Sequence, residues 1–203
     1  MKHRILLYAF GLTIFISKAN AQGLSDWQFG ISTIKESFFY PSKHNFIGPY
    51  HPGFSLIAEK QIKELKKSNK ILSLETGFYH HKYFQNGVFL LSGLNYEFRL
   101  KGRLKLRWGP RLGYLHAFSP TGRYKLKDGE FKQIKDWGRP TALAGLAIGA
   151  SYPILNKDEP DKAVDLFFNY QVLVEGPFAP GAGVPVVPHT FLALGIKTKL
   201  FSK

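Results

Sequence analysis

The sequence predicts an all-β protein, built as a single eight-stranded antiparallel up-and-down transmembrane β-barrel. Two long runs of alternating apolar and polar residues, 88–100 and 104–114, meet at a tight turn around Gly102. Period-2 alternation places one set of side chains on each face of a strand. The order of short and long connections and the even number of expected strands support the same fold class.

The two runs are too long, and one face of each is too highly charged, for a soluble sandwich. Tyr96 and Phe98 share one parity of the first run, and Glu97 takes the other. In the second run Trp108 alternates with Arg107 in the same way. Strands in globular proteins usually have about 5–6 residues, and these runs are more than twice as long. A barrel in lipid accommodates both faces, with the apolar set outward and the charged set lining a narrow interior.

The remaining strands follow the same alternation. They are expected at 27–34, 53–61, 71–80, 141–152, 164–174 and 190–200. The run at 141–152 is rich in Gly and Ala, so its two faces cannot be told apart from the sequence. The long connections are 35–52, 119–140 and 175–189, and the shorter ones are 62–70, 101–103 and 153–162, with 81–87 as an exception. Because outer-membrane barrels have short periplasmic turns and long external loops, the long connections are expected outside.

The N-terminal segment has the layout of a secretory signal peptide. A basic start at 2–4 precedes an apolar stretch at 5–16 and a small-x-small site at 19–21. The expected domains are therefore a cleaved signal peptide over 1–21 and an outer-membrane β-barrel domain over 22–203. This layout predicts the outer membrane of a Gram-negative bacterium, with both termini in the periplasm. The chain contains no cysteine, which excludes disulfides and thiolate chemistry.

The inward parity of the expected strands carries many charged residues. They are Glu75, Glu97, Arg99, Lys105, Arg107, Arg111, Asp165, Glu175, Lys197 and Lys199. An eight-stranded barrel is only wide enough for side chains to fill it, and buried charges must be paired. We interpret the set as an internal salt-bridge network that plugs the barrel, with an ion or solute pathway as the alternative. Loss of Arg107 or Glu97 alone is expected to cost about 3–5 kcal/mol. Since basic residues outnumber acids here, an anionic group or a loop carboxylate is missing from the set.

Two further groups of residues are expected on the outer surface. Aromatic side chains that should anchor the barrel at the membrane interfaces are Tyr96, Phe98, Trp108, Tyr114, Phe168 and Tyr170. An aromatic ligand platform is the alternative for this group. The basic external loop carries Arg123, Lys125, Lys127, Lys132, Lys135 and Arg139. It would meet the phosphates and acidic sugars of lipopolysaccharide, unless it is only a solvated loop. The Pro/Gly-rich segment 176–185 is expected to be a lid or a contact for an unidentified protein partner.

The signal peptide, the alternating strands, the order of connections and a final amphipathic strand together resemble the small eight-stranded outer-membrane barrels. The likeness is strongest to the porin-family, or outer membrane beta-barrel domain, proteins common in the Bacteroidota, and it covers essentially all of the mature chain. It implies a non-enzymatic structural or surface-binding role. The implied partners are outer-membrane lipid, lipopolysaccharide and the barrel assembly machinery. A soluble periplasmic lipocalin-like carrier is an alternative fold and function.

A second alternative is an outer-leaflet enzyme that modifies lipid A, since some barrels of this kind deacylate lipid A with a His and a Ser at the outer rim. The nearest pair here is His116 and Ser119. A spacing of three residues points the two side chains to opposite faces of a strand, so no enzyme is expected. Adjacent His80 and His81 also face opposite ways, so no metal site or cofactor is expected. The export signal and the lack of a recognisable motif exclude nucleic acid as a partner.

Overall fold

The computed structural model describes residues 26–37, 48–65, 68–100, 103–127, 129–155, 163–179 and 183–199. The predicted signal peptide and the turn at Gly102 lie outside these residues. No helix in the described ranges has the length and apolar character needed to cross a membrane.

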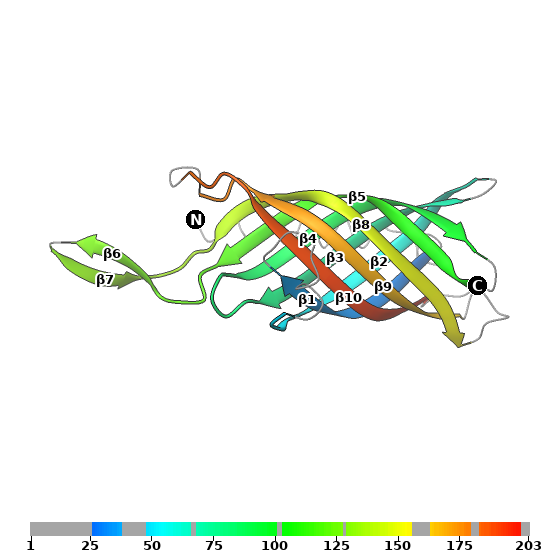
Figure 1. Ribbon diagram of the computed structural model, residues 1–203, viewed down its shortest axis with the longest axis horizontal. Helices are drawn as coiled ribbons and strands as arrows, with labels where there is room; N and C mark the ends of the chain where they lie inside the picture. The colour runs from blue at the N-terminus through cyan, green and yellow to red at the C-terminus, as the bar shows by residue number, and fades with distance from the viewer. Residues whose placement is uncertain are drawn as a thin grey trace, which may run out of the picture.

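The described residues form ten strands, of which eight close into a barrel (Figure 1). The strands are β1 (Trp27–Ser37), β2 (His51–Glu64), β3 (Asn69–His80), β4 (Asn86–Arg99), β5 (Lys105–Phe118), β6 (Arg123–Lys127), β7 (Glu130–Ile134), β8 (Arg139–Leu155), β9 (Val164–Gly176) and β10 (Val187–Lys199). The barrel order is β1-β10-β9-β8-β5-β4-β3-β2, and every pairing in it is antiparallel. The predicted fold class, a single eight-stranded antiparallel up-and-down barrel, is confirmed.

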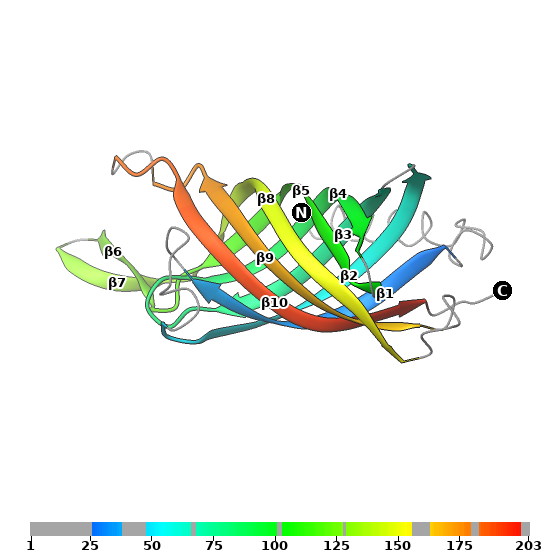
Figure 2. The same cartoon turned by 45° about the vertical axis from the view of Figure 1, so that its right-hand side comes forward.

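The barrel has two distinct ends. β1 and β10 close the wall by pairing from Gln28↔Lys199 to Ser37↔Thr190. One end of the barrel holds Gln28 and Lys199. We call this the terminal end; it also holds the β2–β3, β4–β5 and β8–β9 connections. The opposite, hairpin end carries β6 and β7, which project past the barrel along its long axis in both views (Figures 1 and 2). The strand ends that flank the long predicted connections lie at the hairpin end.

The barrel strands have 11 to 17 residues, and their side chains alternate between the two faces as predicted. On β4, Leu90 is 54% exposed while its neighbour Leu91 is 1% exposed. The two faces of the Gly/Ala-rich β8 can be assigned in the same way, because Leu143 points inward and Leu146 outward. Every barrel strand exposes large apolar side chains on its outer face, for example Ile31, Leu56, Leu74, Leu90, Leu112, Ile148, Leu166 and Leu194.

The connection predicted as an irregular loop at 119–140 is instead built around a β-hairpin. β6 and β7 pair from Arg123↔Ile134 to Lys127↔Glu130. Gly129 lies between them at φ +82°, a left-handed conformation that glycine adopts without steric cost. The alternation of apolar and basic residues in this segment is the period-2 signal of a strand, and the high charge obscured it.

Candidate functional site

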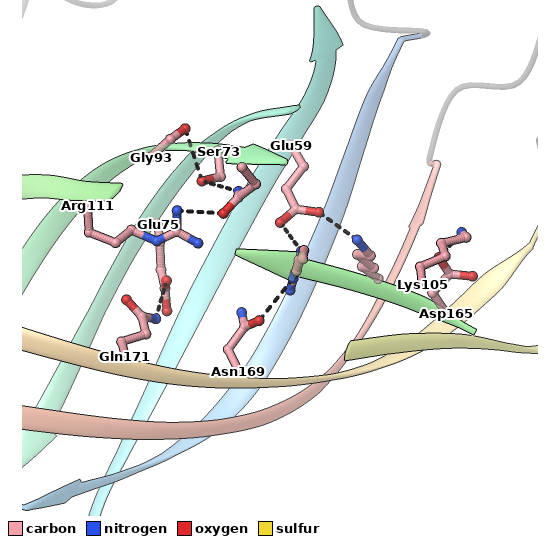
Figure 3. A network of polar contacts seen from close by, with 12 residues as sticks. Glu59, Ser73, Glu75, Gly93, Lys105, Arg111, Asp165, Asn169 and Gln171 are labelled. Carbon is pink, nitrogen blue, oxygen red and sulfur yellow. Dashed lines mark hydrogen bonds and ion pairs between the residues drawn. The ribbon is translucent and has the colours of Figure 1, made fainter. Parts of the chain in front are cut away.

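Ion-paired side chains cross the interior toward the terminal end (Figure 3). The Glu59 carboxylate accepts hydrogen bonds from the Arg107 guanidinium and, at 2.6 Å, from Lys197 Nζ. Arg107 Nε donates to Asn169 Oδ1 at 3.0 Å. All four side chains are buried. Their hydrogen bonds tie β2, β5, β9 and β10 together across the lumen.

A second ion pair lies nearer the rim. Lys105 Nζ donates to Asp165 Oδ2 at 2.7 Å, which joins β5 to β9. Asp165 is buried, whereas the Lys105 side chain is 22% exposed. Arg99 differs from the prediction. It is exposed at the end of β4 and lines the cavity at the terminal end of the lumen, since it lies two residues beyond Glu97 at the rim.

The middle of the lumen is filled by hydrogen bonds around Glu75 and Arg111 (Figure 3). Ser55 Oγ and Gln171 Nε2 each donate to Glu75 at 2.8 Å. Arg111 Nη1 donates to Asn95 Oδ1 at 2.8 Å. The Gln171–Glu75 bond crosses the lumen between β9 and β3, which are not neighbours in the barrel, while the other two bonds join adjacent strands. These buried side chains occupy space in the lumen that a channel would need.

Gly93 makes room for this packing. A Cβ atom at Gly93 would fall against Arg111 Nη1 and lie 2.8 Å from Ser73 Oγ. The glycine on β4 thus leaves the space that the Arg111 side chain fills, and any larger residue would displace the guanidinium.

An apolar layer separates the two ends of the lumen. Its members come from every barrel strand except β2 and are at most 4% exposed: Ile34, Tyr79, Phe89, Leu91, Leu115, Ala117, Leu143, Leu173, Phe191 and Ala193. The Phe191 ring lies 5.2 Å from that of Phe89 and 5.5 Å from that of Tyr79, measured between centroids. We call this layer the septum. The charged residues of the inward parity do not reveal this layer, because its members are uncharged.

A second polar cluster lies between the septum and the hairpin end. The His189 imidazole is fully buried between two carboxylates, 3.0 Å from Glu36 Oε1 and 2.9 Å from Glu175 Oε2. Gln85 Nε2 donates to Glu175 Oε2 at 2.7 Å, and Arg139 Nη2 pairs with Glu175 Oε1 at 3.0 Å. The prediction that Arg139 belongs to the external loop is therefore wrong. Arg139 begins β8 and closes this cluster.

Aromatic side chains cover this cluster at the hairpin end. The rings of Phe84 and Phe178 stack with centroids 5.5 Å apart, and the Arg139 guanidinium lies 3.9 Å from the centre of Phe178. His81 Nδ1 accepts hydrogen bonds from the amides of Tyr83 and Phe84, at 3.3 and 3.1 Å. Burial lowers the pKa of His81, which favours the neutral imidazole that can accept them. The short β3–β4 connection is thereby held over the mouth.

The acids missing from the predicted network are two strand carboxylates, not a loop carboxylate. Glu59 lies on the inward face of β2 and Glu36 on that of β1. Glu36 lies beyond the predicted strand 27–34. Glu97 is buried but makes no hydrogen bond or ion pair with another described residue. It lines a cavity of about 480 Å³ at the terminal end. The predicted large effect of losing Glu97 is therefore no longer expected.

The six predicted interface aromatics all point away from the lumen. Trp108, Tyr114 and Phe168 are 49%, 45% and 41% exposed, and the other three are partly exposed. Tyr96 and Trp108 stack across β4 and β5 with centroids 5.4 Å apart. Tyr114 lies nearer the hairpin end, whereas Trp108 lies near the terminal end. Their role at membrane interfaces stays a prediction.

The outer hairpin, β6 and β7, is exposed at every described residue. Lys125 lies directly opposite Lys132, an arrangement of like charges that destabilises a strand pair. Lys125 and Lys127 contact no carboxylate among the described residues. Beside the hairpin, Lys135 Nζ lies 4.2 Å from the centre of the Trp137 ring. Lys125 and Lys127 are thus open to an external anion, whereas Lys132 Nζ lies 3.8 Å from the exposed Glu130 carboxylate.

His116 and Ser119 are not brought together. His116 Nδ1 lies 2.7 Å from the Tyr114 hydroxyl and Nε2 lies 3.0 Å from the Trp137 carbonyl oxygen. Ser119 Oγ instead lies 3.4 Å from Thr121 Oγ1. In the part of the chain that the structure describes, no group of three or more His, Cys, Asp or Glu residues is arranged to hold a metal ion.

Asp136 holds the base of the outer hairpin. Its carboxylate accepts hydrogen bonds from the Ser119 amide at 2.7 Å, the Gly138 amide at 3.0 Å and Arg123 Nη1 at 3.3 Å. The Ser119 amide, followed by the Gly138 amide and Arg123, lowers the pKa of Asp136 below its usual 3.8. A depressed pKa means that these contacts persist above the usual value and are lost as the pH falls through the lowered one.

We expect Asp136→Asn to loosen the hairpin base at neutral pH, because the amide lacks the charge that strengthens these three bonds. Amide hydrogen exchange at Ser119 and Gly138 should speed up in the variant. In the unsubstituted protein, the same amides should lose protection only as the pH falls below about 3.8. Unchanged exchange at both amides in Asp136→Asn would contradict this role.

The fold and interior define a class: a closed up-and-down barrel with an apolar outer wall and a lumen filled by side chains. No family model matches the chain, and no curated protein matches it. Solved structures similar to the chain include Neisserial surface protein A (NspA), with 16% identity, a TM-score of 0.49 and coverage of 86% of this chain and 96% of that one. Ail, the attachment invasion locus protein of Yersinia pestis, has 14% identity, a TM-score of 0.40 and coverage of 84% and 95%. Ail in complex with the heparin analogue sucrose octasulfate has 15% identity, a TM-score of 0.38 and coverage of 84% of this chain and 95% of that one.

Proposed function

We propose that this chain is a non-enzymatic outer-membrane barrel of a Gram-negative bacterium, exported by residues 1–21 and inserted by the barrel assembly machinery. The observation that supports this proposal most strongly is that the barrel is apolar outside and polar inside, the inverse of a soluble protein. All eight barrel strands expose large apolar side chains outward, while ion pairs fill much of the lumen. This arrangement suits hydrocarbon outside and a packed interior. A lipocalin-like soluble carrier would need the reverse, a polar wall around an apolar cavity.

The proposed orientation places the terminal end in the periplasm and the outer hairpin at the cell surface. Because the chain lacks cysteine, single-cysteine variants test this cleanly. A membrane-impermeant maleimide should label Lys127→Cys in intact cells, and Lys63→Cys at the terminal end only after the outer membrane is permeabilised. Labelling of Lys63→Cys alone in intact cells would reverse the orientation. Recovery of the protein in the soluble periplasm would overturn the membrane location.

The proposed role is a surface contact with lipopolysaccharide through the cations of the outer hairpin. Phosphates and acidic sugars offer a counter-charge to Lys125 and Lys127, and would compete with the exposed Glu130 carboxylate, 3.8 Å away, for Lys132. The combined variant Lys125→Gln, Lys127→Gln and Lys132→Gln should weaken binding of purified lipopolysaccharide to the detergent-solubilised protein. Binding of the unsubstituted protein should weaken with added salt. Lys63→Gln, a cation at the other end, serves as the control. Equal binding of lipopolysaccharide by the triple variant and the control would contradict this role.

We propose no enzymatic activity, since His116 engages Tyr114 and Trp137 rather than Ser119. A general base must lie within hydrogen-bond reach of the nucleophile that it activates. Mass spectrometry of lipid A should therefore show the same acyl chains with and without this protein. An acyl chain that is lost or added in dependence on His116 would contradict the proposal.

We expect the purified barrel to show no stable conductance steps in planar bilayers. The septum places a layer of buried apolar side chains between two polar clusters, and hydrophobic constrictions stop ions by excluding water. The measurement is single-channel recording at several voltages, with a general-diffusion porin as the positive control. Reproducible unitary steps that depend on this protein would contradict a closed interior.

A further inference from the structure

The outer hairpin has one apolar face that nothing in the described structure covers. The register places Tyr124 opposite Gln133 and Leu126 opposite Phe131. Opposite residues of an antiparallel pair point to the same side. Tyr124, Leu126 and Phe131 are 61%, 59% and 75% exposed. We call these four residues the apolar face of the hairpin; contiguous exposed apolar surface of this kind marks an interaction site.

The hairpin cannot cover this face with its own barrel. Both views show β6 and β7 projecting away from the wall along the barrel axis (Figures 1 and 2). Among the described strands, β6 and β7 pair only with each other. A lone two-stranded hairpin is marginally stable in water, and packing of its apolar face against another layer stabilises it. A partner surface is therefore needed to hold the hairpin in this conformation.

The two faces of the hairpin need different partners. Lys125, Lys127 and Lys132 lie on the opposite side, where the anionic groups of a sugar layer would satisfy them. Leu126, at the centre of the apolar face, has neither a ring on which a sugar could stack nor a polar group. It gains free energy only when another apolar surface removes it from water. The occupant of the apolar face is therefore a protein surface.

We propose that the apolar face packs against the same face of a second copy of this chain in the same membrane. Tyr124, Leu126, Phe131 and Gln133 are uncharged, although the chain as a whole has a formal net charge of +14. Packing these faces together leaves the lysines of each copy on the far sides, away from one another. This inference rests on the proposed membrane location, because two copies in one bilayer hold their hairpins at the same height. A twofold axis along the membrane normal then relates them.

The expected contact is weak and depends on confinement in the membrane. Two aromatic rings and one leucine bury roughly 300 Å² per copy, or about 600 Å² in total. Stable interfaces in solution bury about 1,200 Å² or more. Confinement in a bilayer raises the effective concentration of one copy around another. The dimer should thus form in membranes and dissociate on dilution in detergent.

Single-cysteine variants test the pairing directly, since the chain has no cysteine of its own. A short bis-maleimide added to intact cells should link Leu126→Cys, and separately Phe131→Cys, into dimers. Lys125→Cys and Lys132→Cys are matched controls, because both positions are also exposed in the same strands but face the other way. They should give about tenfold less dimer. Adding Phe131→Lys to Leu126→Cys should also reduce the dimer about tenfold, through loss of one buried apolar side chain.

Each other outcome decides against the pairing. Equal dimer yields from both faces would indicate random collision, and the absence of dimer from Leu126→Cys would show that the face meets no second copy. A cross-link from Leu126→Cys to a different protein alone would assign the face to that protein. Surface labelling of Lys125→Cys with an impermeant maleimide separates these results from a failure of the proposed membrane location. If Lys125→Cys is not labelled in intact cells, the proposed location or orientation is wrong.

Discussion

Replacing Glu59 with glutamine should lower the free energy of unfolding by about 3–5 kcal/mol. The Glu59 carboxylate is the shared acceptor for Arg107 and Lys197, and all three side chains are at most 4% exposed. Without the carboxylate, two buried cations lose the counter-charge that offsets their desolvation. The measurement is urea-induced unfolding of the purified barrel in lipid vesicles, followed by its mobility on unheated gels.

Glu97→Gln is the matched control for this effect. Glu97 is buried in the same half of the lumen and has the same chemistry, but it lies at the terminal cavity without a hydrogen-bonded partner among the described residues. Its replacement should change the free energy of unfolding by less than about 1 kcal/mol, as for weakly paired charges. Equal losses in Glu59→Gln and Glu97→Gln would show that the ion pairs of Figure 3 do not set the stability of the barrel.

Replacing Phe191 with alanine should also cost about 3–5 kcal/mol. The Phe191 side chain is fully buried in the septum, against the rings of Phe89 and Tyr79. Its removal loses the transfer free energy of the ring and leaves a cavity that the closed wall cannot collapse to fill. The same unfolding assay in vesicles measures the loss.

Phe168→Ala on the outer face of β9 is the control for the cavity contribution. The Phe168 ring is 41% exposed on the wall, where lipid fills the space that the truncation leaves. The variant should lose only the transfer free energy of the ring, about 2 kcal/mol. A loss as large as that of Phe191→Ala would mean that the septum is not tightly packed.

The wall of the barrel could be predicted from the sequence, because one period-2 signal fixes both the strands and their faces. Leu90 and Trp108 point outward and Arg107 and Arg111 inward, as the alternation predicts. The lumen was harder to predict, since parity states which side chains enter it but not which of them meet. Arg107 lies opposite Glu97 in the register, yet pairs with Glu59 from a strand across the barrel.

The hairpin end could not be predicted because its residues come together only when the barrel closes. Glu36 and His189 are 153 positions apart in the chain, and the strand that carries Glu36 extends past its predicted end. The predicted strand begins at residue 141, which leaves Arg139 in the loop, but β8 begins at Arg139, and a proline fits at the second position of a strand start. The outer hairpin has a regular alternation of apolar and basic residues. Its many lysines are also typical of a solvated loop, which is why the strands were not predicted.

The central claim is that the apolar wall faces hydrocarbon, and the fluorescence of Trp108 tests it most directly. The chain has three tryptophans, so Trp27→Phe with Trp137→Phe leaves only Trp108, which is 49% exposed on the outer face of β5. In vesicles, lipids brominated in their acyl chains should quench Trp108 strongly and aqueous iodide should not. The reverse is expected for the variant that retains only Trp137, beside the outer hairpin. Strong iodide quenching of Trp108, with no effect of brominated lipid, would contradict the account.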